Sequence, residues 1–365
     1  MLKYMIKKNK ITYFIALKIY YFLRFVLQLD NRKSLTHTLN RKIIFLKEFQ
    51  NLRLNKKKKM GIVYDLNCSP FTLGDFFNAA MTARFFQMKG YDINFFIIRY
   101  DLNQKILNKN RKRFEFFYQE FQKILKSLLP KKYHIYNFNW EEFNKYKNVK
   151  QFILFEKRVR KRKYIYGFLF NFLNNLILKE NENFSKKFLL NRKNLKKNGR
   201  LKIPKFKYVT LHCRHNILQT RKKNNRNLKK NEFLKIIKKL KNRFKKHKII
   251  VVSDKLGCNF FKKFAIEKKL KIEFSKKFSS SFINDGILVL NSDYYFQFWG
   301  GGINVFPWYS KLPHLRSAPV QQNELPQSKN QLSVWHDERH FFIENDRRDI
   351  EEFLEKLMKV EINAK

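Results

Sequence analysis

The chain contains very little glycine and proline for its length. Its 365 residues include ten glycines and seven prolines. In so depleted a sequence, the glycines and prolines that are present mark positions where the backbone geometry requires them. Three of the glycines are consecutive, at residues 300 to 302, and Pro307 and Pro313 follow closely. This stretch is therefore the first place to look for a functional turn.

Cysteine and metal-binding patterns are also scarce. The three cysteines, Cys68, Cys213 and Cys258, are odd in number and far apart, which argues against a disulfide framework or a zinc knuckle and fits a reducing cytoplasm. The sequence has no Asp-x-Asp motif and no metal-ligand cluster of recognisable spacing. We therefore expect neither a bound metal nor a cofactor.

Acidic residues are few beside basic ones, 29 against 80, which gives a formal net charge of +51. Such a charge is typical of nucleic-acid binders. However, the abundance of Lys, Asn, Ile, Phe and Tyr is the bias of an AT-rich genome, and we interpret much of the charge as solvated surface without specificity for nucleic acid. Lysines interleaved with aromatic residues still leave open a nucleic-acid-binding or nucleotide-modifying enzyme, or a non-catalytic protein that binds polymers at a membrane.

The N-terminal region has one long apolar run, over residues 11 to 29, but Lys18 and Arg24 interrupt it. Basic flanks and several tyrosines suit a basic amphipathic helix lying on an anionic membrane surface. An ordinary helix packed on the protein suits the pattern equally. We expect residues 1–58 to form a separate basic, aromatic segment and the protein to be cytoplasmic, in peripheral contact with the inner face of the membrane.

Alternating strand and helix patterns follow in two blocks. Apolar runs at 61–65 and 91–100 flank a helical pattern at 75–89, for which Thr72 is a candidate cap and Gly90 a terminator. These segments predict a βαβ unit in a first domain over residues 59–185, and the basic tract 186–206 predicts an exposed connector.

A second domain is predicted over residues 207–345, before a C-terminal helix in 346–365. The 365 residues exceed the usual size of one hydrophobic core, and two α/β domains with parallel sheets facing a cleft are the natural division. Strands are predicted at 208–214, 249–253 and 287–290, and helices at 231–244 and 258–268.

The first candidate site is Gly74 and Asp75, which follow the first predicted strand. Ligands of open parallel sheets bind beyond the carboxyl ends of the strands. A carboxylate held there can act as a general base on a hydroxyl group. Acidic residues also stabilise the first turn of a helix, and this role for Asp75 stays open.

The second candidate site is the glycine stretch with the two residues that follow it. Glycines let main-chain N–H groups approach a phosphate closely at a helix start, and Pro307 is tolerated only near such a start. We expect phosphate binding by Gly300, Gly301, Gly302, Ile303 and Asn304. The alternative is a tight packing turn.

The third candidate site follows the first strand of the second domain. His212 and Arg214 lie on the same side of that strand by alternation, and Arg is the preferred residue for bidentate phosphate contacts. A buried structural role for His212 stays open. Arg221, Ser253 and Asp254 are further candidate contacts, with a solvated surface charge as the alternative for Arg221 and a helix cap for Asp254.

In their order along the chain, these motifs resemble those of glycosyltransferases with the GT-B fold, of the heptosyltransferase-like and fucosyltransferase-like types. Gly74-Asp75 is similar to the Gly-Asp of heptosyltransferases, and His212-x-Arg214 to the basic motif of fucosyltransferases. The stretch from Asp293 through Gly302 to Pro313 resembles the strand, glycine turn and helix that hold the donor phosphates. Gly301 and Asn304 depart from the heptosyltransferase pattern.

The resemblance implies two Rossmann-like domains and transfer of a hexosyl, heptosyl or fucosyl group from a nucleotide-diphosphate sugar. The acceptor would be a glycan or glycolipid in the synthesis of cell-surface polysaccharide or lipopolysaccharide. The reaction would be inverting and independent of metal. Asp75 would be the base, and Arg214 with residues 300–304 would hold the donor phosphates.

Overall fold

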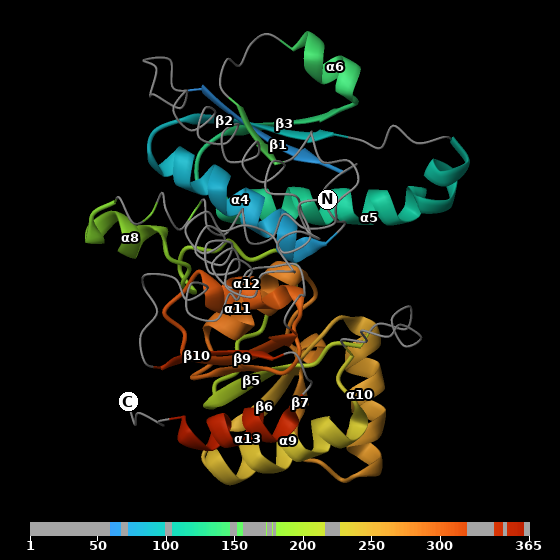
Figure 1. Ribbon diagram of the computed structural model, residues 1–365, viewed down its shortest axis with the longest axis vertical. Coiled ribbons are helices and arrows are strands. Elements are labelled where there is room, and N and C mark those ends of the chain that lie inside the picture. Colours follow the sequence, from blue (N-terminus) through green and yellow to red (C-terminus); the bar gives the residue numbers. More distant parts are fainter. Residues whose placement is uncertain are drawn as a thin grey trace, which may run out of the picture.

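The computed structural model describes residues 59–66, 72–98, 104–146, 152–155, 173, 177, 180–215, 227–319, 339–345 and 349–360. The apolar run at 11–29 lies outside these ranges, as do Cys68 and Arg221. Two parallel sheets organise the described residues, one in each half of the molecule (Figure 1). The predicted α/β class with two parallel sheets is confirmed.

The first half contains a four-stranded sheet in the order β3-β2-β1-β4, in which every pair is parallel. Helices α4 and α5 cover the face that carries Ile62 and Phe95, and α6 packs on the opposite face through Phe143. The elements are β1 (Lys59–Asp65), α4 (Leu73–Met88), β2 (Asp92–Ile98), α5 (Gln104–Leu128), β3 (Tyr133–Phe138), α6 (Trp140–Lys145) and β4 (Phe152–Phe155).

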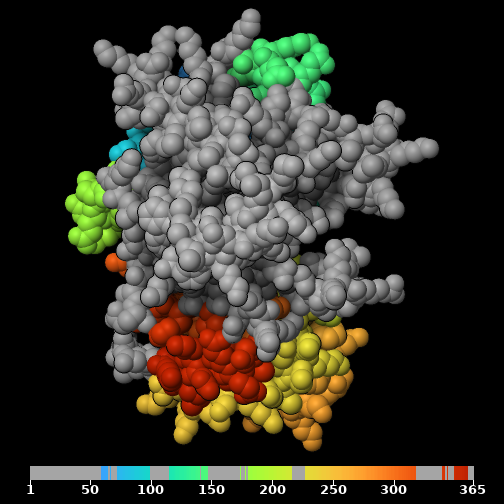
Figure 2. All heavy atoms as spheres, viewed as in Figure 1, coloured from blue at the N-terminus to red at the C-terminus, as the bar shows by residue number. Residues whose placement is uncertain are grey.

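The second half contains a six-stranded parallel sheet in the order β10-β9-β8-β5-β6-β7. Helices α9 and α13 lie side by side on its outer face, where Figure 2 shows them at the molecular surface. The elements are β5 (Tyr208–His212), α9 (Lys230–Arg243), β6 (Lys248–Val252), α10 (Lys255–Glu267), β7 (Glu273–Phe274), η2 (Ser275–Lys277), α11 (Phe282–Leu290), β8 (Tyr295–Gln297), η3 (Gly302–Asn304), α12 (Val305–Trp308), β9 (His314–Pro319), β10 (His340–Asn345) and α13 (Ile350–Lys359). Helix α8 (Glu182–Phe188), which precedes β5 in the chain, packs on α4 of the first half.

One predicted strand is wrong. Residues 287–290 belong to helix α11. This helix begins after its cap Ser281, and the Ser281 hydroxyl accepts a hydrogen bond from the N–H of Asn284 at 3.2 Å. Residues 283–289 of this helix are buried, and its only polar residues, Asn284 and Asp285, lie in the first turn. Residues 286–290 are all apolar or glycine, so the stretch taken for a strand has no polar side to reveal the helical period. The strand of this βαβ unit is instead β8, only three residues long.

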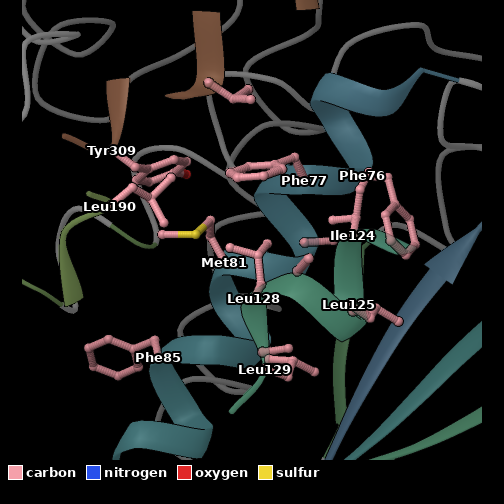
Figure 3. Packing of buried hydrophobic residues seen from close by; sticks show 14 of the residues in the cluster. Phe76, Phe77, Met81, Phe85, Ile124, Leu125, Leu128, Leu129, Leu190 and Tyr309 are labelled. Carbon is pink, nitrogen blue, oxygen red and sulfur yellow. The ribbon is translucent and has the colours of Figure 1, made fainter. Parts of the chain in front are cut away.

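Helices α11 and α12 lie on the face of the second sheet that is turned toward the first half, and there they meet α4 (Figure 1). One hydrophobic cluster therefore includes residues of both halves, among them Phe77, Met81, Phe306 and Tyr309. Figure 3 shows Tyr309 and Leu190 beside Phe77 and Met81. This shared cluster brings the start of α4 close to the segment that follows β8.

The segment 189–207 connects the two halves. Its lysines are exposed, as the sequence predicts, but Leu189, Leu190 and Leu195 are buried. The N–H of Leu190 donates to the carbonyl of Tyr309 at 2.7 Å, and the N–H of Lys196 donates to the carbonyl of Ser127 at 3.4 Å. The connector is thus bound along its length to both halves of the molecule.

Candidate functional site

The start of α4 carries the first candidate motif. Thr72 caps the helix by accepting a hydrogen bond from the N–H of Asp75 at 3.3 Å, and its hydroxyl donates to Oδ2 of the same carboxylate. The Asp75 side chain is buried, 4% exposed. The prediction that Thr72 caps this helix is therefore confirmed. Thr72 also fixes the orientation of the carboxylate at the helix start, which suits either role considered for Asp75.

The glycine stretch forms a sharp turn directly after β8. Trp299 and Gly300 have φ angles of +67° and +87°, in the left-handed region that glycine adopts readily and tryptophan rarely. Gly301 is extended, and η3 with α12 follows as a short helical segment that includes Pro307. This helical segment is short. Its dipole is correspondingly small, and any anion would be held mainly by main-chain N–H groups.

The glycine turn offers several such donors. Among the described residues, none accepts a hydrogen bond from the main-chain N–H of Gly300, Gly301 or Gly302. Gly302 is exposed, whereas Gly300 is buried. Successive N–H groups in a turn of this kind form a concave surface suited to anions.

The first two motifs meet at the junction of the halves. A Cβ atom on Gly74 would lie 2.9 Å from the carbonyl oxygen of Gly302 and 3.0 Å from its Cα. Main chain therefore faces main chain at this point, and no side chain fits at position 74 without a shift of the backbone. The structure brings Asp75 and the glycine turn to one place, although most of the chain separates them in sequence.

The third motif lies beneath the turn. The ring of His212, the last residue of β5, lies directly against Gly301. A Cβ atom added to Gly301 would be only 1.9 Å from the ring Cε1. The Nδ1 atom of His212 is buried and has no hydrogen-bond partner among the described residues. Burial, with a smaller contribution from the nearby Arg214 cation, lowers the pKa of His212 to about 3. The imidazole is thus neutral at pH 7.

His212 belongs to a buried row of polar side chains that crosses the sheet. The strand register places it beside Gln297 of β8, and Gln297 beside Arg316 of β9. Nε2 of Gln297 donates to the carbonyl of Gly301 at 3.3 Å, and the Arg316 guanidinium lies over the Trp308 ring at 4.7 Å. Burial lowers the pKa of Arg316 to about 10, so it keeps its charge at pH 7. The polar row supports the glycine turn and places a cation near it.

Gln297 and Arg316 were missed as candidates in the sequence. A signal for them exists, because polar residues alternate with apolar ones along these strands. Thr210 and His212 alternate with Leu211 in β5, and Gln297 and Arg316 hold equivalent positions in the two neighbouring strands. The alternation is readable only once β8 and β9 are known to be strands.

The remaining candidates have varied surroundings. Arg214 lies two residues beyond β5 and is partly exposed, at the edge where the turn lies. Ser253 donates its hydroxyl to the carbonyl of Cys213 at 2.5 Å, and Asp254 caps α10 by accepting from the N–H of Gly257 at 2.7 Å. The cap considered for Asp254 is therefore present.

The two candidate residues that follow the glycine stretch, Ile303 and Asn304, differ in their exposure. Ile303 turns its side chain into the shared hydrophobic cluster, so that only its main chain could meet a ligand. Asn304 is partly exposed.

Among the described residues, no group of three or more His, Cys, Asp or Glu side chains is placed to hold a metal ion. None of the described helices is both long enough and apolar enough to cross a membrane.

The sequence matches no protein-family model and no curated protein. Several solved structures are similar in arrangement. A glycosyl transferase family 9 structure from Veillonella parvula is 8% identical, with a TM-score of 0.38, over 86% of this chain and 92% of that one. The ADP-heptose lps heptosyltransferase II of E. coli is 9% identical, with a TM-score of 0.39, over 82% and 98%.

A glycosyltransferase from Rickettsia africae is 11% identical, with a TM-score of 0.31, over 84% of this chain and 88% of that one.

Proposed function

We propose that the protein is a glycosyltransferase that takes a sugar from a nucleotide-diphosphate donor and passes it to a hydroxyl group of a glycan or glycolipid. The observation that carries the proposal is the meeting of Gly74-Asp75 with residues 300–302. A buried carboxylate lies there together with a turn whose N–H groups have no acceptor within the described part of the chain, beyond the carboxyl ends of β1 and β8.

The chemistry requires both groups. The acceptor hydroxyl must lose a proton as its oxygen attacks the anomeric carbon, and Asp75 is the carboxylate in place to accept that proton. The bond from the anomeric carbon to the diphosphate breaks in the same step, and negative charge develops on the diphosphate. Donors and cations that are already in position stabilise this charge, the role proposed for the glycine turn and Arg214.

Direct displacement of this kind inverts the anomeric configuration, because one base acts and no covalent intermediate forms. Neutralisation by Arg214 and main-chain N–H groups needs no metal ion to bridge the diphosphate. We therefore propose an inverting reaction without a metal. Synthesis of a cell-surface polysaccharide or lipopolysaccharide is the proposed setting, with the protein in peripheral contact with an anionic membrane.

The test compares two aspartate substitutions across a panel of UDP-, GDP- and ADP-sugars, with release of the nucleotide as the readout. Asp75→Asn should lower the release rate by at least about a hundredfold, the usual contribution of a general base, and should leave nucleotide binding intact. The matched control is Asp349→Asn, which alters a helix cap on the exposed start of α13. Equal rates in the two variants, or a product of retained configuration, would contradict the role of Asp75.

A further inference from the structure

The contact between the two halves is made largely of buried aromatic and aliphatic side chains. The Phe77 ring of α4 lies 4.7 Å from Phe306 and 6.4 Å from Tyr309, both from the second half. All three side chains are fully buried. Domains of one chain move relative to each other by default, unless their interface is large and hydrophobic. This interface is of the hydrophobic kind.

One directional interaction crosses this apolar contact. The Tyr309 hydroxyl donates to Oδ1 of Asn78 at 3.0 Å, and both side chains are at most 2% exposed. Apolar contacts are non-directional, whereas a buried hydrogen bond holds only over a narrow range of distances and angles. Loss of one partner leaves the other buried and unsatisfied, which is unfavourable. The pair therefore selects one registration of α4 against α12.

The hydrogen bond lies close to the candidate site on both sides. Asn78 follows Asp75 by about one turn of α4. Tyr309 directly follows α12, the short helix that continues from the glycine turn through η3. Any shift of α4 against α12 would change the separation between the Asp75 carboxylate and the turn.

The connector adds a second restraint. Nδ2 of Asn284 in α11 donates to the carbonyls of Asn198 and Arg200, at 2.6 Å and 2.9 Å. The hydrogen bonds from Leu190 to Tyr309 and from Lys196 to Ser127 attach the same segment to α12 and to the end of α5. These hydrogen bonds restrain the connector on both sides, and we therefore expect it to permit little hinge motion between the halves.

We propose that Asn78 and Tyr309 are positioning residues that hold Asp75 and the glycine turn at a fixed separation, so that the halves do not close on binding a nucleotide. The roles of Asp75 and the turn rest on the proposed function. The fixed separation does not, because it depends only on the contacts between the halves.

The test measures the distance between the halves by electron spin resonance of paired spin labels. Labels are attached at Lys126→Cys on α5 and Lys239→Cys on α9, both exposed helical positions, in a Cys68→Ser background. The two cysteines that are described, Cys213 and Cys258, are buried. We expect one narrow distance distribution, unchanged by saturating UDP, GDP or ADP.

Substitutions then separate positioning from mere stability. Tyr309→Phe should broaden the distribution and slow release of nucleotide from a donor sugar, with the Kd for the diphosphate unchanged. The matched control is Tyr208→Phe, which also removes a buried hydroxyl, one that donates to the carbonyl of Leu288 at 2.8 Å inside the second half. That variant should lose stability and keep the narrow distribution.

The double variant Asn78→Leu/Tyr309→Phe gives the decisive comparison. Replacing both partners by apolar groups removes the unsatisfied atom, so the Tm should recover relative to Tyr309→Phe while the distribution stays broad. A narrow distribution in the double variant would overturn the positioning role, because packing alone would then set the separation. A broad distribution in the wild type, or a shift on adding nucleotide, would overturn the fixed separation. If no diphosphate binds, the proposed function fails, and the nucleotide-free distributions still decide this inference.

Discussion

The two faces of the six-stranded sheet are built from the same strands and have opposite chemistry. The outer face, under α9 and α13, is apolar: Leu211, Phe296 and Leu315 pack there with Phe233 and Phe353. The inner face, under α11 and α12, carries a polar row that is equally buried: Thr210, His212, Gln297, His314 and Arg316. Only the alternation of side chains along each strand separates the two sets.

The difference in polarity between the two faces indicates which of them supports the proposed site. Buried polar groups cost free energy unless they are hydrogen-bonded, and buried charges cost more. The outer face demonstrates that this sheet can be packed with apolar side chains alone. Two polar residues of the inner face contact the glycine turn: Gln297 donates to the carbonyl of Gly301, and the His212 ring lies against the Gly301 Cα. We therefore interpret the inner face as the part of the sheet that supports the site, and the outer face as the part that supports stability.

The largest expected effect is on the outer face. Leu315→Ala removes a fully buried side chain from the apolar cluster and should lower the free energy of unfolding by about 3 kcal/mol. Nucleotide affinity, measured by calorimetry on the folded protein, should be unchanged. A marked loss of affinity with little loss of stability would reverse the assignment of the two faces.

A smaller effect on stability, with a larger effect on binding, is expected at the turn. Gly301→Ala forces a Cβ into the His212 ring, which should cost about 2 kcal/mol and weaken nucleotide binding about tenfold, or 1.4 kcal/mol. Urea denaturation and calorimetry measure the two quantities.

The contact itself can be tested by pairing this substitution with one beneath it. In the double variant His212→Ala/Gly301→Ala the ring is absent, and the cost should be less than the sum of the single costs. Gly300→Ala is the comparison, since a Cβ there meets nothing within 4 Å and is disfavoured only by its φ of +87°. Adding His212→Ala should therefore not lower the cost of Gly300→Ala. Additive costs for His212 and Gly301 would show that the ring does not limit this position.

The smallest effect at neutral pH is expected from the titration of His212, which changes the stability only as the pH falls. Burial and Arg214 lower the pKa of His212 from 6.5 to about 3, so the unfolded chain binds a proton between these values and the folded chain does not. The stability associated with His212 is therefore complete above pH 6.5 and declines as the pH falls, by at most about 1.4 kcal/mol per unit. His212→Gln should remove this part of the slope. Identical slopes in both proteins, from denaturation between pH 4 and 7, would show that the histidine is not buried as a neutral group.

The sequence was sufficient for the features that depend on local pattern. The βαβ unit at the start of the first half is present, with Thr72 as the cap of α4, and so is the series of β5, α9, β6 and α10. The scarcity of glycine pointed to residues 300–302, and the structure finds main-chain geometry that explains it: a positive φ at Gly300, and the His212 ring against Gly301.

Features that depend on long-range packing could not be predicted in this way. The end of helix α11 was taken for a strand because residues 286–290 carry no polar side chain, so no helical period is visible there. The connector is also held by buried leucines that lie among exposed lysines. The spacing of these leucines has no clear period, so their burial is not visible in the sequence. The charge of Arg316 does not stand out in a chain with 80 lysines and arginines, and the alternation that marks it can be read only once β9 is known to be a strand. The role of Arg316 follows only from the register that places it beside Gln297.

The central claim is that this junction binds a nucleotide diphosphate specifically, and the most direct test is calorimetric titration with UDP, GDP, ADP and CMP at high salt, with RNA as a polyanion control. Arg214→Ala is compared with Arg192→Ala, which removes the same charge from an exposed position in the connector. The account predicts saturable, salt-resistant binding of one diphosphate that is lost only in Arg214→Ala. Binding of RNA alone, abolished by salt and equal in both variants, would contradict it and would favour a nucleic-acid-binding protein.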